Sequence, residues 1–121
     1  MARLLLIEKG RLREEVAMQG DSLRIGRDPQ SHIRINEATV SRYHAEIFRR
    51  GESYFLEDKK STNGTRLNGR VVTEKKILKD KDKIAIGSAV LVFDKHALVG
   101  EEVNSDFHDS TSTVYDLLKY R

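Results

Sequence analysis

The 121-residue sequence contains no cysteine, no tryptophan and a single proline. The lack of cysteine excludes disulfide bonds, thiolate nucleophiles and zinc sites with sulfur ligands. Long hydrophobic runs are also missing, because the longest, residues 89–93, is far shorter than the roughly 20 residues that a membrane-spanning helix needs. The apolar residues 4–7 are followed by a charged pair and are too few for a secretory signal. We therefore expect a cytoplasmic protein that does not bind a membrane.

Groups that carry catalysis or bind metals are scarce as well. The four histidines show no spacing typical of metal ligands, so we expect no metal site. The adjacent carboxylates Glu57–Asp58 and Glu101–Glu102 would point to opposite faces of an extended chain, which predicts solvated charges rather than a catalytic pair. No pairing of a nucleophile with a base stands out. The sequence therefore favours a protein that is not an enzyme and uses no cofactor.

Charge, in contrast, is abundant and unevenly distributed. Charged residues make up 34% of the chain, with a net charge of +3. Residues 1–100 carry 20 basic and 14 acidic side chains, whereas residues 101–121 carry two basic and five acidic ones. This length supports one hydrophobic core and not two. We predict one domain over residues 1–100, an acidic, Ser/Thr-containing tail over 101–121, and an anionic ligand for the basic domain.

Short apolar segments recur at intervals of roughly ten residues and are separated by turn residues. Alternation of apolar and polar residues is clear at 23–25, 33–35 and 84–86, and β-branched and aromatic residues are frequent in these segments. Residues before 100 show no long stretch with helical spacing of apolar positions. The sequence therefore predicts an all-β fold, a sandwich of two antiparallel sheets.

Three of the predicted connections are rich in directional hydrogen-bonding groups, namely 26–31, 36–44 and 61–69. The side chains that stand out in them are Arg27, Ser41, Arg42, Thr62 and Asn63. Guanidinium, hydroxyl and amide donors without neighbouring paired carboxylates are suited to an oxyanion, and arginine–phosphate hydrogen bonds are among the strong ones. A phosphothreonine offers about −1.5 to −2 charge and three acceptor oxygens, which matches this set of donors.

These residues also carry a resemblance to a known family. The motifs, in order, are Gly26-Arg27, Ser41-Arg42-Tyr43-His44 and Asn63-Gly64-Thr65-Arg66-Leu67-Asn68-Gly69. Together with the closing strand at 82–87, they resemble the signature of the forkhead-associated (FHA) domain over residues 4–95. The resemblance implies a β-sandwich of about 10–11 short strands followed by a short tail. It also implies recognition of phosphothreonine peptides without catalysis.

The resemblance assigns a role to each matching position in the three loops. Arg27 and Ser41 match the phosphate-binding arginine and serine of the family, and Arg42 matches a further contact to the peptide or the phosphate. Asn63 matches the asparagine that hydrogen-bonds the backbone of the ligand. Thr62, beside it, completes the pocket for phosphothreonine.

Other matching positions are implied to support the site. His44 matches a structural histidine that braces the loop of Ser41, and Asn68 is implied to fix the loop that carries Thr65. Turn glycines are implied at Gly26, Gly64 and Gly69. Some members of the family have a basic residue two positions before the phosphate-binding serine, where this chain has Thr39. The preference for residues after the phosphothreonine therefore stays open.

Plainer interpretations remain for the same residues. Arg27 is also compatible with a solvated turn, Ser41 with a cap, and Asn63-Gly64 is a common hairpin pair. The alternative function is a small basic nucleic-acid-binding protein, favoured by the pI of about 9.2. Against it, the aromatic residues are mostly embedded in apolar segments and form no basic–aromatic stripe. A structural module that has lost ligand binding is a third reading, opposed by the retained loop residues.

The expected partner is a phosphothreonine-containing protein linked to a Ser/Thr kinase, not a nucleic acid. The tail supplies candidate phospho-acceptors at Thr111 and Thr113. Asp116 stands three residues after Thr113, a position to which the family is often sensitive. The phosphorylated tail of the same or a neighbouring chain is therefore a second candidate ligand. The alternative is an acidic linker, in which residues 114–120 form two helical turns only when docked.

Overall fold

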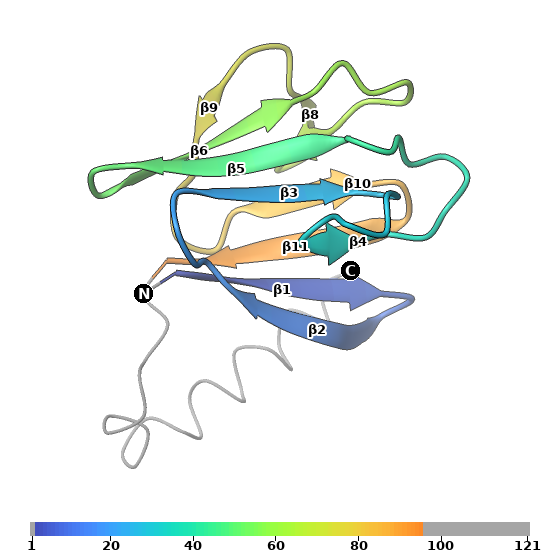
Figure 1. Cartoon of the computed structure of the whole chain (residues 1–121), viewed down its shortest axis with the longest axis horizontal. Helices are drawn as coiled ribbons and strands as arrows, with labels where there is room; N and C mark the ends of the chain where they lie inside the picture. The colour runs from blue at the N-terminus through green and yellow to red at the C-terminus, as the bar shows by residue number, and fades with distance from the viewer. Residues whose placement is uncertain (1, 96–121) are drawn as a thin grey trace.

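Eleven strands make up residues 2–95, the part of the chain that the computed structural model describes (Figure 1). They are β1 Arg3–Glu8, β2 Arg11–Ala17, β3 Ser22–Gly26, β4 Ile33–Arg34, β5 Ala45–Arg50, β6 Ser53–Asp58, β7 Arg66–Leu67, β8 Arg70–Val71, β9 Lys76–Ile77, β10 Lys83–Ile86 and β11 Ala89–Asp94. These residues contain no helix, so the prediction of an all-β fold is confirmed. The predicted boundary at residue 100 and the whole tail, including Thr111 and Thr113, lie outside the described residues.

The strands form two layers. The six-stranded sheet has the order β2-β1-β11-β10-β7-β8, and the five-stranded sheet has the order β4-β3-β5-β6-β9. Their pairs are antiparallel except for β3 and β4, which pair in parallel with Ile25 opposite Ile33. The sheets are therefore mostly antiparallel rather than wholly so. The reason is that residues 27–32 fold back along β3 before β4 begins.

The core lies between the two sheets and follows the alternation of the sequence. In β10, Ile84 and Ile86 are fully buried while the residues beside them are only half-buried. Ile47 and Leu56 face them from the five-stranded sheet, also without solvent exposure. Full burial of an Ile or Leu side chain contributes about 1.5–3 kcal/mol, so such pairs across the layers hold the sandwich together.

The outer face of the five-stranded sheet differs from the prediction made for its aromatic residues. Phe48 and Phe55 alternate with core residues and therefore lie half-buried on the outer face, with ring centroids 5.5 Å apart. Arg50 and Lys75 each lie 5.4 Å from the centroid of the Phe48 ring. A local basic–aromatic cluster therefore exists, although the sequence predicted none. Strand alternation, rather than local hydrophobicity, turns these rings outward.

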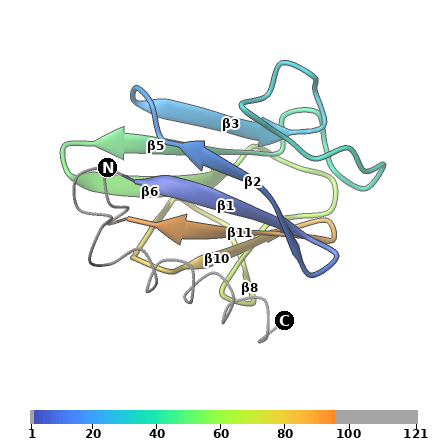
Figure 2. The ribbon, with the colours of Figure 1, turned by 90° about the horizontal axis from the view of Figure 1, so that it is seen from below.

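Three connections meet at one end of the sandwich, on the right in Figure 1. They are 27–32 between β3 and β4, 35–44 between β4 and β5, and 59–65 between β6 and β7. The view from below places the same connections at the same end (Figure 2). We call them the first, second and third end loops. The sheet topology thus brings together the first two segments that the sequence singled out and the first part of the third, whereas residues 66–69 form β7 and the turn that follows it.

Candidate functional site

Arg27 opens the first end loop and is held by the second. Its backbone N–H donates to the carbonyl of Ser41 at 3.0 Å, and its side-chain Nε donates to the carbonyl of Val40 at 2.9 Å. The neighbouring Asp28 accepts the backbone N–H of Gln30 at 2.8 Å instead of pairing with Arg27. Within residues 2–95 no carboxylate forms an ion pair with Arg27. The terminal guanidinium nitrogens are therefore oriented and open to an anion.

Gly26 allows the first and second end loops to pack together. A Cβ at this position would overlap the carbonyl oxygen of Arg42 and lie 2.8 Å from its carbonyl carbon. The backbone of residue 42 therefore reaches the end of β3 only because residue 26 has no side chain. The glycine serves this close approach of the chain to itself, while Arg42 remains exposed.

His44 is a fully buried brace between the second and third end loops. Its Nδ1 accepts the backbone N–H of Ser41 at 3.0 Å, so its Nε2 carries the proton and donates to the carbonyl of Gly64 at 2.8 Å. The Ser41 hydroxyl oxygen accepts the backbone N–H of Thr62 at 3.0 Å. Because that oxygen is already used as an acceptor, its proton is free to point to a ligand.

Asp58, at the end of β6, organises the third end loop. Its carboxylate accepts the backbone N–H of Ser61 at 3.0 Å and the hydroxyls of Ser61 and Thr65 at 2.6 Å each. Burial raises the pKa of Asp58, but these hydrogen bonds outweigh that effect and hold its pKa below the ordinary value of 3.8. The prediction of a solvated Asp58 is therefore wrong. Its side chain folds the loop back on itself instead.

Asn63 projects from the third end loop toward the second. Its Nδ2 donates to the carbonyl of Thr39 at 2.8 Å, and Gly64 after it adopts a left-handed backbone with φ of 88°. Among the described residues the carboxamide oxygen of Asn63 has no hydrogen-bond donor. An exposed side chain of this kind offers one acceptor and one further N–H to a ligand.

Glu37, which no sequence motif singled out, links the second end loop to the opposite sheet. Its carboxylate accepts the backbone N–H of Ser88 at 3.1 Å and the Ser88 hydroxyl at 2.6 Å. Ser88 lies in the turn between β10 and β11. The two residues are 51 positions apart, so no local sequence pattern indicates that they bond to each other. For Asp58 the signal was present in the Asp-x-x-Ser spacing, because an aspartate side chain can cap the backbone N–H and the hydroxyl of a residue three positions later.

Asn68 and Gly69 lie away from this cluster. Both have positive φ, of 51° and 88°, and they form the two-residue turn between β7 and β8. The Asn68 side chain donates to Asp82 at 2.9 Å and accepts the backbone N–H of Lys83 at 3.0 Å. It therefore fastens the turn to the start of β10, whereas Thr65 is held by Asp58 and not by Asn68.

The charge balance at the end loops favours an anion. Arg34 donates from Nε to the carbonyl of Arg27 at 3.0 Å, which adds a third guanidinium to those of Arg27 and Arg42. The carboxylates of this region are hydrogen-bonded to hydroxyl and amide groups, as described for Asp28, Glu37 and Asp58. The guanidinium groups are thus left for a ligand, and charge-assisted hydrogen bonds to phosphate contribute about 1.5–3 kcal/mol each.

Residues 2–95 contain no group of three or more metal-ligating side chains. They also contain no helix that is long and apolar enough to cross a membrane.

Comparison with known proteins identifies the family to which these loops belong. The model of the FHA domain family matches residues 23–87, which include all three end loops. The oxoglutarate dehydrogenase inhibitor of Corynebacterium jeikeium is 36% identical over 91 residues, which cover 74% of this chain and 62% of the relative. The glycogen accumulation regulator GarA of Mycolicibacterium smegmatis is 40% identical over 68 residues, or 56% of this chain and 42% of the relative. The chain thus spans less than two thirds of the length of these curated relatives.

Solved structures agree with the family match. An FHA domain studied for its phosphothreonine-dependent interactions is 33% identical, with a TM-score of 0.72, and the match covers 80% of this chain and 98% of that one. The FHA domain of FhaA, solved in complex with the intracellular domain of another protein, is 32% identical with a TM-score of 0.69. That match covers 77% of this chain and 99% of the other.

Proposed function

Because this chain belongs to the FHA domain family, we propose that it is a phosphothreonine-peptide-binding module of a signalling system, without catalytic activity of its own. The observation that carries the proposal is the convergence of Arg27, Ser41 and Asn63 at one end of the sandwich, with donors that the described fold leaves open. The similarity to a phosphothreonine-dependent FHA domain supports the choice of ligand.

The phosphate group of the ligand binds between the first two end loops. Arg27 donates from its terminal guanidinium nitrogens, while its Nε stays on Val40 and fixes the direction of the group. The Ser41 hydroxyl donates its free proton, and the exposed Arg42 and Thr62 supply further donors at the rim. The ligand thus replaces the water around these donors by charge-assisted bonds of fixed geometry.

Asn63 recognises the backbone of the peptide rather than its phosphate. Its carboxamide presents an acceptor and a donor side by side, which is the pattern that pairs with the N–H and C=O of an extended chain. The hydrogen bond to Thr39 keeps this side chain across the gap between two end loops. Phosphate binding and backbone binding therefore act together, and an isolated phosphate ion binds more weakly than the peptide.

The experiment that tests this function is calorimetric titration of phosphothreonine peptides selected from a library. Arg27→Ala is expected to weaken binding about tenfold to a hundredfold, since at least one charge-assisted bond is lost. Arg70→Ala, which removes an exposed arginine from β8, is the matched control and leaves the affinity unchanged. Equal binding of phosphorylated and unphosphorylated peptides, or wild-type affinity of Arg27→Ala, would contradict the proposal.

A nucleic-acid ligand has one observation in its favour, the cluster around Phe48. In that cluster Arg50 and Lys75 both lie over the ring of Phe48, and Phe55 stacks beside it. The ring of Phe48 is therefore already in contact with side chains of the protein, which compete with a base for its faces. Titration of single-stranded DNA over a salt series tests this alternative, and we expect only weak, salt-sensitive binding.

The proposed partner is a protein phosphorylated on threonine by a Ser/Thr kinase, and the proposed compartment is the cytoplasm. The two curated relatives bear the names of an inhibitor and a regulator, which supports a regulatory role carried out by binding. Co-purification of the partner with wild-type protein, and its loss with Arg27→Ala, would identify it.

The tail is proposed as a second source of ligand. Phosphorylated Thr113, followed by Asp116 at the third position, or phosphorylated Thr111, binds the end loops of the same or a neighbouring chain. Tethering gives such a site an effective concentration in about the millimolar range. Peptides that contain either phosphothreonine are titrated against the unphosphorylated chain. If neither binds while a library-selected peptide does, the tail is a linker.

A further inference from the structure

Strands β1 and β11 carry apolar side chains on both of their faces. In β1, Leu5 and Ile7 alternate with residues of the core and therefore point away from the core. Val92 of β11 pairs with Leu5 and lies on the same outer face of the six-stranded sheet. These three residues form a buried cluster separate from the core, and with their half-buried neighbours Leu12 and Val90 we call it the outer cluster.

The outer cluster is buried as deeply as the core between the sheets. Leu5, Ile7 and Val92 are each 1% exposed. An antiparallel sheet that faces water on one side carries polar, accessible residues there. The apolar neighbours that residues 2–95 supply, Leu12 and Val90, belong to the same sheet and do not form a layer over it. The outer cluster therefore needs a cover that the described residues do not provide.

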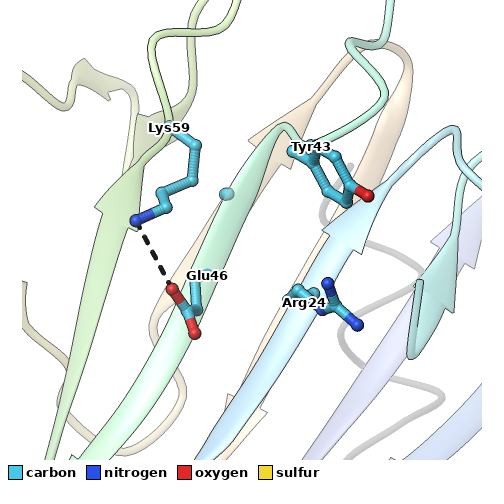
Figure 3. A pocket seen from close by; sticks show the side chains of 5 residues that line it. Arg24, Tyr43, Glu46 and Lys59 are labelled. Atoms are coloured by element: carbon cyan, nitrogen blue, oxygen red, sulfur yellow. Dashed lines mark ion pairs between the residues drawn. The ribbon is translucent and has the colours of Figure 1, made fainter. Parts of the chain in front are cut away.

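The outer face of the five-stranded sheet is different, because charged side chains occupy it. The ammonium group of Lys59 pairs with the carboxylate of Glu46 at 3.5 Å, as the dashed line in Figure 3 marks. The guanidinium of Arg24 lies 5.7 Å from the centroid of the Tyr43 ring, which stays 56% exposed. Such groups tolerate contact with water. This face stays accessible, whereas the aliphatic residues of the outer cluster are buried.

Cations border the outer cluster on the side of β10 and β7. Lys83 pairs with Val92 and shares its face of the sheet. Arg66 lies opposite Ala85, which in turn lies opposite Val90 of the cluster. Within residues 2–95 neither Lys83 nor Arg66 forms an ion pair. A segment that covers the cluster therefore gains from carrying negative charge.

The chain continues from β11 into the tail, residues 101–121, which combines acidic with apolar side chains. It carries five acidic and two basic residues, so its net charge is opposite to that of the cations beside the outer cluster. Val114, Leu117 and Leu118 have the spacing that places side chains on one face of a helix. The tail thus offers an apolar face and negative charge, the two properties that a cover for the outer cluster needs.

The position at which β11 ends brings the tail within reach of the outer cluster. Figure 1 shows that β11 ends on the side of the sandwich away from the end loops, and Val92 lies two residues before that end. An extended chain from Asp94 to Val114 spans up to roughly 66–72 Å, which is enough to turn back over the sheet. Chain length therefore permits the tail to cover the sheet from which it leaves.

We propose that the tail folds back on its own domain and that Val114, Leu117 and Leu118 cover the outer cluster. Two helical turns have little stability alone in water, so burial of their apolar face against the sheet provides their order. Thr113 directly precedes the docked segment and is thereby held at a fixed place on the domain. This inference uses neither the end loops nor a phosphate, so it is independent of the proposed phosphothreonine binding.

The absence of cysteine from the chain permits a test by disulfide trapping in the full chain. Ala85→Cys, on the outer face opposite Val90, is combined with Leu117→Cys and oxidised mildly. We expect an intramolecular disulfide, seen as a faster-migrating monomer on a non-reducing gel. The control combines Leu117→Cys with Ser53→Cys, at the start of β6 in the other sheet. The docked pair is expected to form its disulfide at least about tenfold faster, because docking raises the effective concentration of one thiol near the other.

A second test removes the apolar face of the tail. Leu117→Ser combined with Leu118→Ser is expected to shift the methyl NMR signals of Leu5 and Val92, since these side chains lose their cover. Tyr115→Ser is the matched control, because residue 115 lies off the face that residues 114, 117 and 118 share on a helix. It is expected to leave those signals unchanged. Both changes lie in the tail, so the strands of the sandwich are not altered.

Each outcome decides the proposal. Faster trapping with Ala85→Cys than with Ser53→Cys, together with shifted methyl signals, supports the docked tail. A disulfide-linked dimer from the Ala85→Cys pair would overturn docking within one chain and identify a second copy as the cover. Equal trapping rates, or unchanged methyl signals in the double serine variant, would overturn docking of the tail altogether. No measurement here uses a phosphothreonine peptide, so these failures leave the proposed function untouched.

Discussion

Two Asn-Gly pairs stand five residues apart in this chain and have opposite surroundings. In the first, Gly64 has a left-handed backbone, with φ of 88°, but Asn63 does not. In the second, Asn68 and Gly69 both have positive φ, as a two-residue hairpin turn of type I′ requires. The same dipeptide therefore forms a loop corner in one place and a hairpin turn in the other.

The side chains of the two asparagines differ even more than their backbones. Both ends of the Asn68 carboxamide are bonded within the fold, to Asp82 and to the backbone of Lys83. Asn63 uses only one N–H, on the carbonyl of Thr39. The fold thus holds the Asn68 carboxamide at both ends, whereas the Asn63 oxygen receives no donor from the described residues and is available to a ligand. The contacts that each asparagine makes elsewhere in the fold, and not the dipeptide itself, distinguish the structural role of Asn68-Gly69 from the proposed binding role of Asn63-Gly64.

The largest expected effect comes from replacing His44, whose side chain holds Gly64 of the first Asn-Gly pair. His44→Ala leaves the N–H of Ser41 and the carbonyl of Gly64 without a partner and opens a cavity beneath them. We expect a loss of about 2–4 kcal/mol in the free energy of unfolding, together with weaker peptide binding. This corresponds to a fall in melting temperature on the order of 10–20 °C, measured by circular dichroism.

Ser41→Ala is the matched variant for His44→Ala. It removes the hydroxyl that donates to the phosphate but keeps the backbone N–H on which His44 depends. Affinity is expected to fall by about tenfold with little change in melting temperature. An unchanged melting temperature for His44→Ala would show that the histidine does not brace the end loops.

Asp58 and Asp82, which bond to the loop of the first Asn-Gly pair and to the turn of the second, provide the next comparison. Asp58→Ala removes three hydrogen bonds from the third end loop and is expected to cost about 2–3 kcal/mol of stability and about tenfold in affinity. Asp82→Ala frees Asn68 and the backbone N–H of Lys79, and is expected to cost about 1–2 kcal/mol of stability alone. Denaturant unfolding and peptide titration of both variants measure these differences. Equal losses of affinity would contradict the separation of the two regions.

Much of the fold could be predicted from the sequence because its core strands alternate. Ile84 and Ile86 are separated by one half-buried residue, and the segment reads as a strand without further knowledge. Strands β7, β8 and β9 have two residues each and no such pattern, so their pairing with longer neighbours alone determines them. The edge strand β2 begins at Arg11 and is mostly polar, with consecutive apolar residues only from Val16 onward. Only Leu12 and Val16 of this edge strand are half-buried, and the other five residues are exposed, so the strand lacks the regular alternation of a core strand.

The candidate site was predictable where its residues act through their own side chains. Arg27, Ser41 and Asn63 are recognisable as donors from the sequence, and the fold brings their loops together. Glu37 could not be found in this way, because its partner Ser88 belongs to the other sheet. A local sequence pattern shows which hydrogen-bonding groups a loop carries. It does not show which distant residues hold that loop in place.

The asparagines themselves are expected to show smaller effects of opposite kind. Asn63→Ala is expected to weaken peptide binding by about tenfold, with little loss of stability because the side chain is exposed. Asn68→Ala places an alanine at φ of 51° and is expected to cost about 1–2 kcal/mol of stability, with unchanged affinity. Glycine adopts this backbone conformation without strain. Asn68→Gly therefore measures the loss of the two side-chain hydrogen bonds alone. Weaker binding by Asn68→Ala would show that the hairpin turn contributes to the site.

The smallest expected effect concerns pH, since Asp58 is only half-buried and solvent screens its charge. Burial raises the pKa of Asp58, but the hydrogen bonds from Ser61 and Thr65 lower it by more. The folded pKa of Asp58 therefore lies below the ordinary 3.8. The pKa of Asp94 is lowered too, because bonds from Lys81 and Arg3 outweigh the effect of burial. A carboxyl group with a depressed folded pKa stabilises the protein above its unfolded pKa.

The stabilisation by these two groups is therefore complete above about pH 5 and is lost as the pH falls through 3.8 toward the folded pKa values. Asp58→Asn cannot take up this proton, so its unfolding free energy is expected to be lower than that of the wild type at neutral pH and to fall less steeply below pH 5. Asp94→Asn flattens the same profile without affecting peptide affinity, because its partners lie outside the end loops. Denaturant unfolding at several pH values measures both slopes. A wild-type slope in Asp58→Asn would mean that the charge of this carboxylate does not stabilise the third end loop.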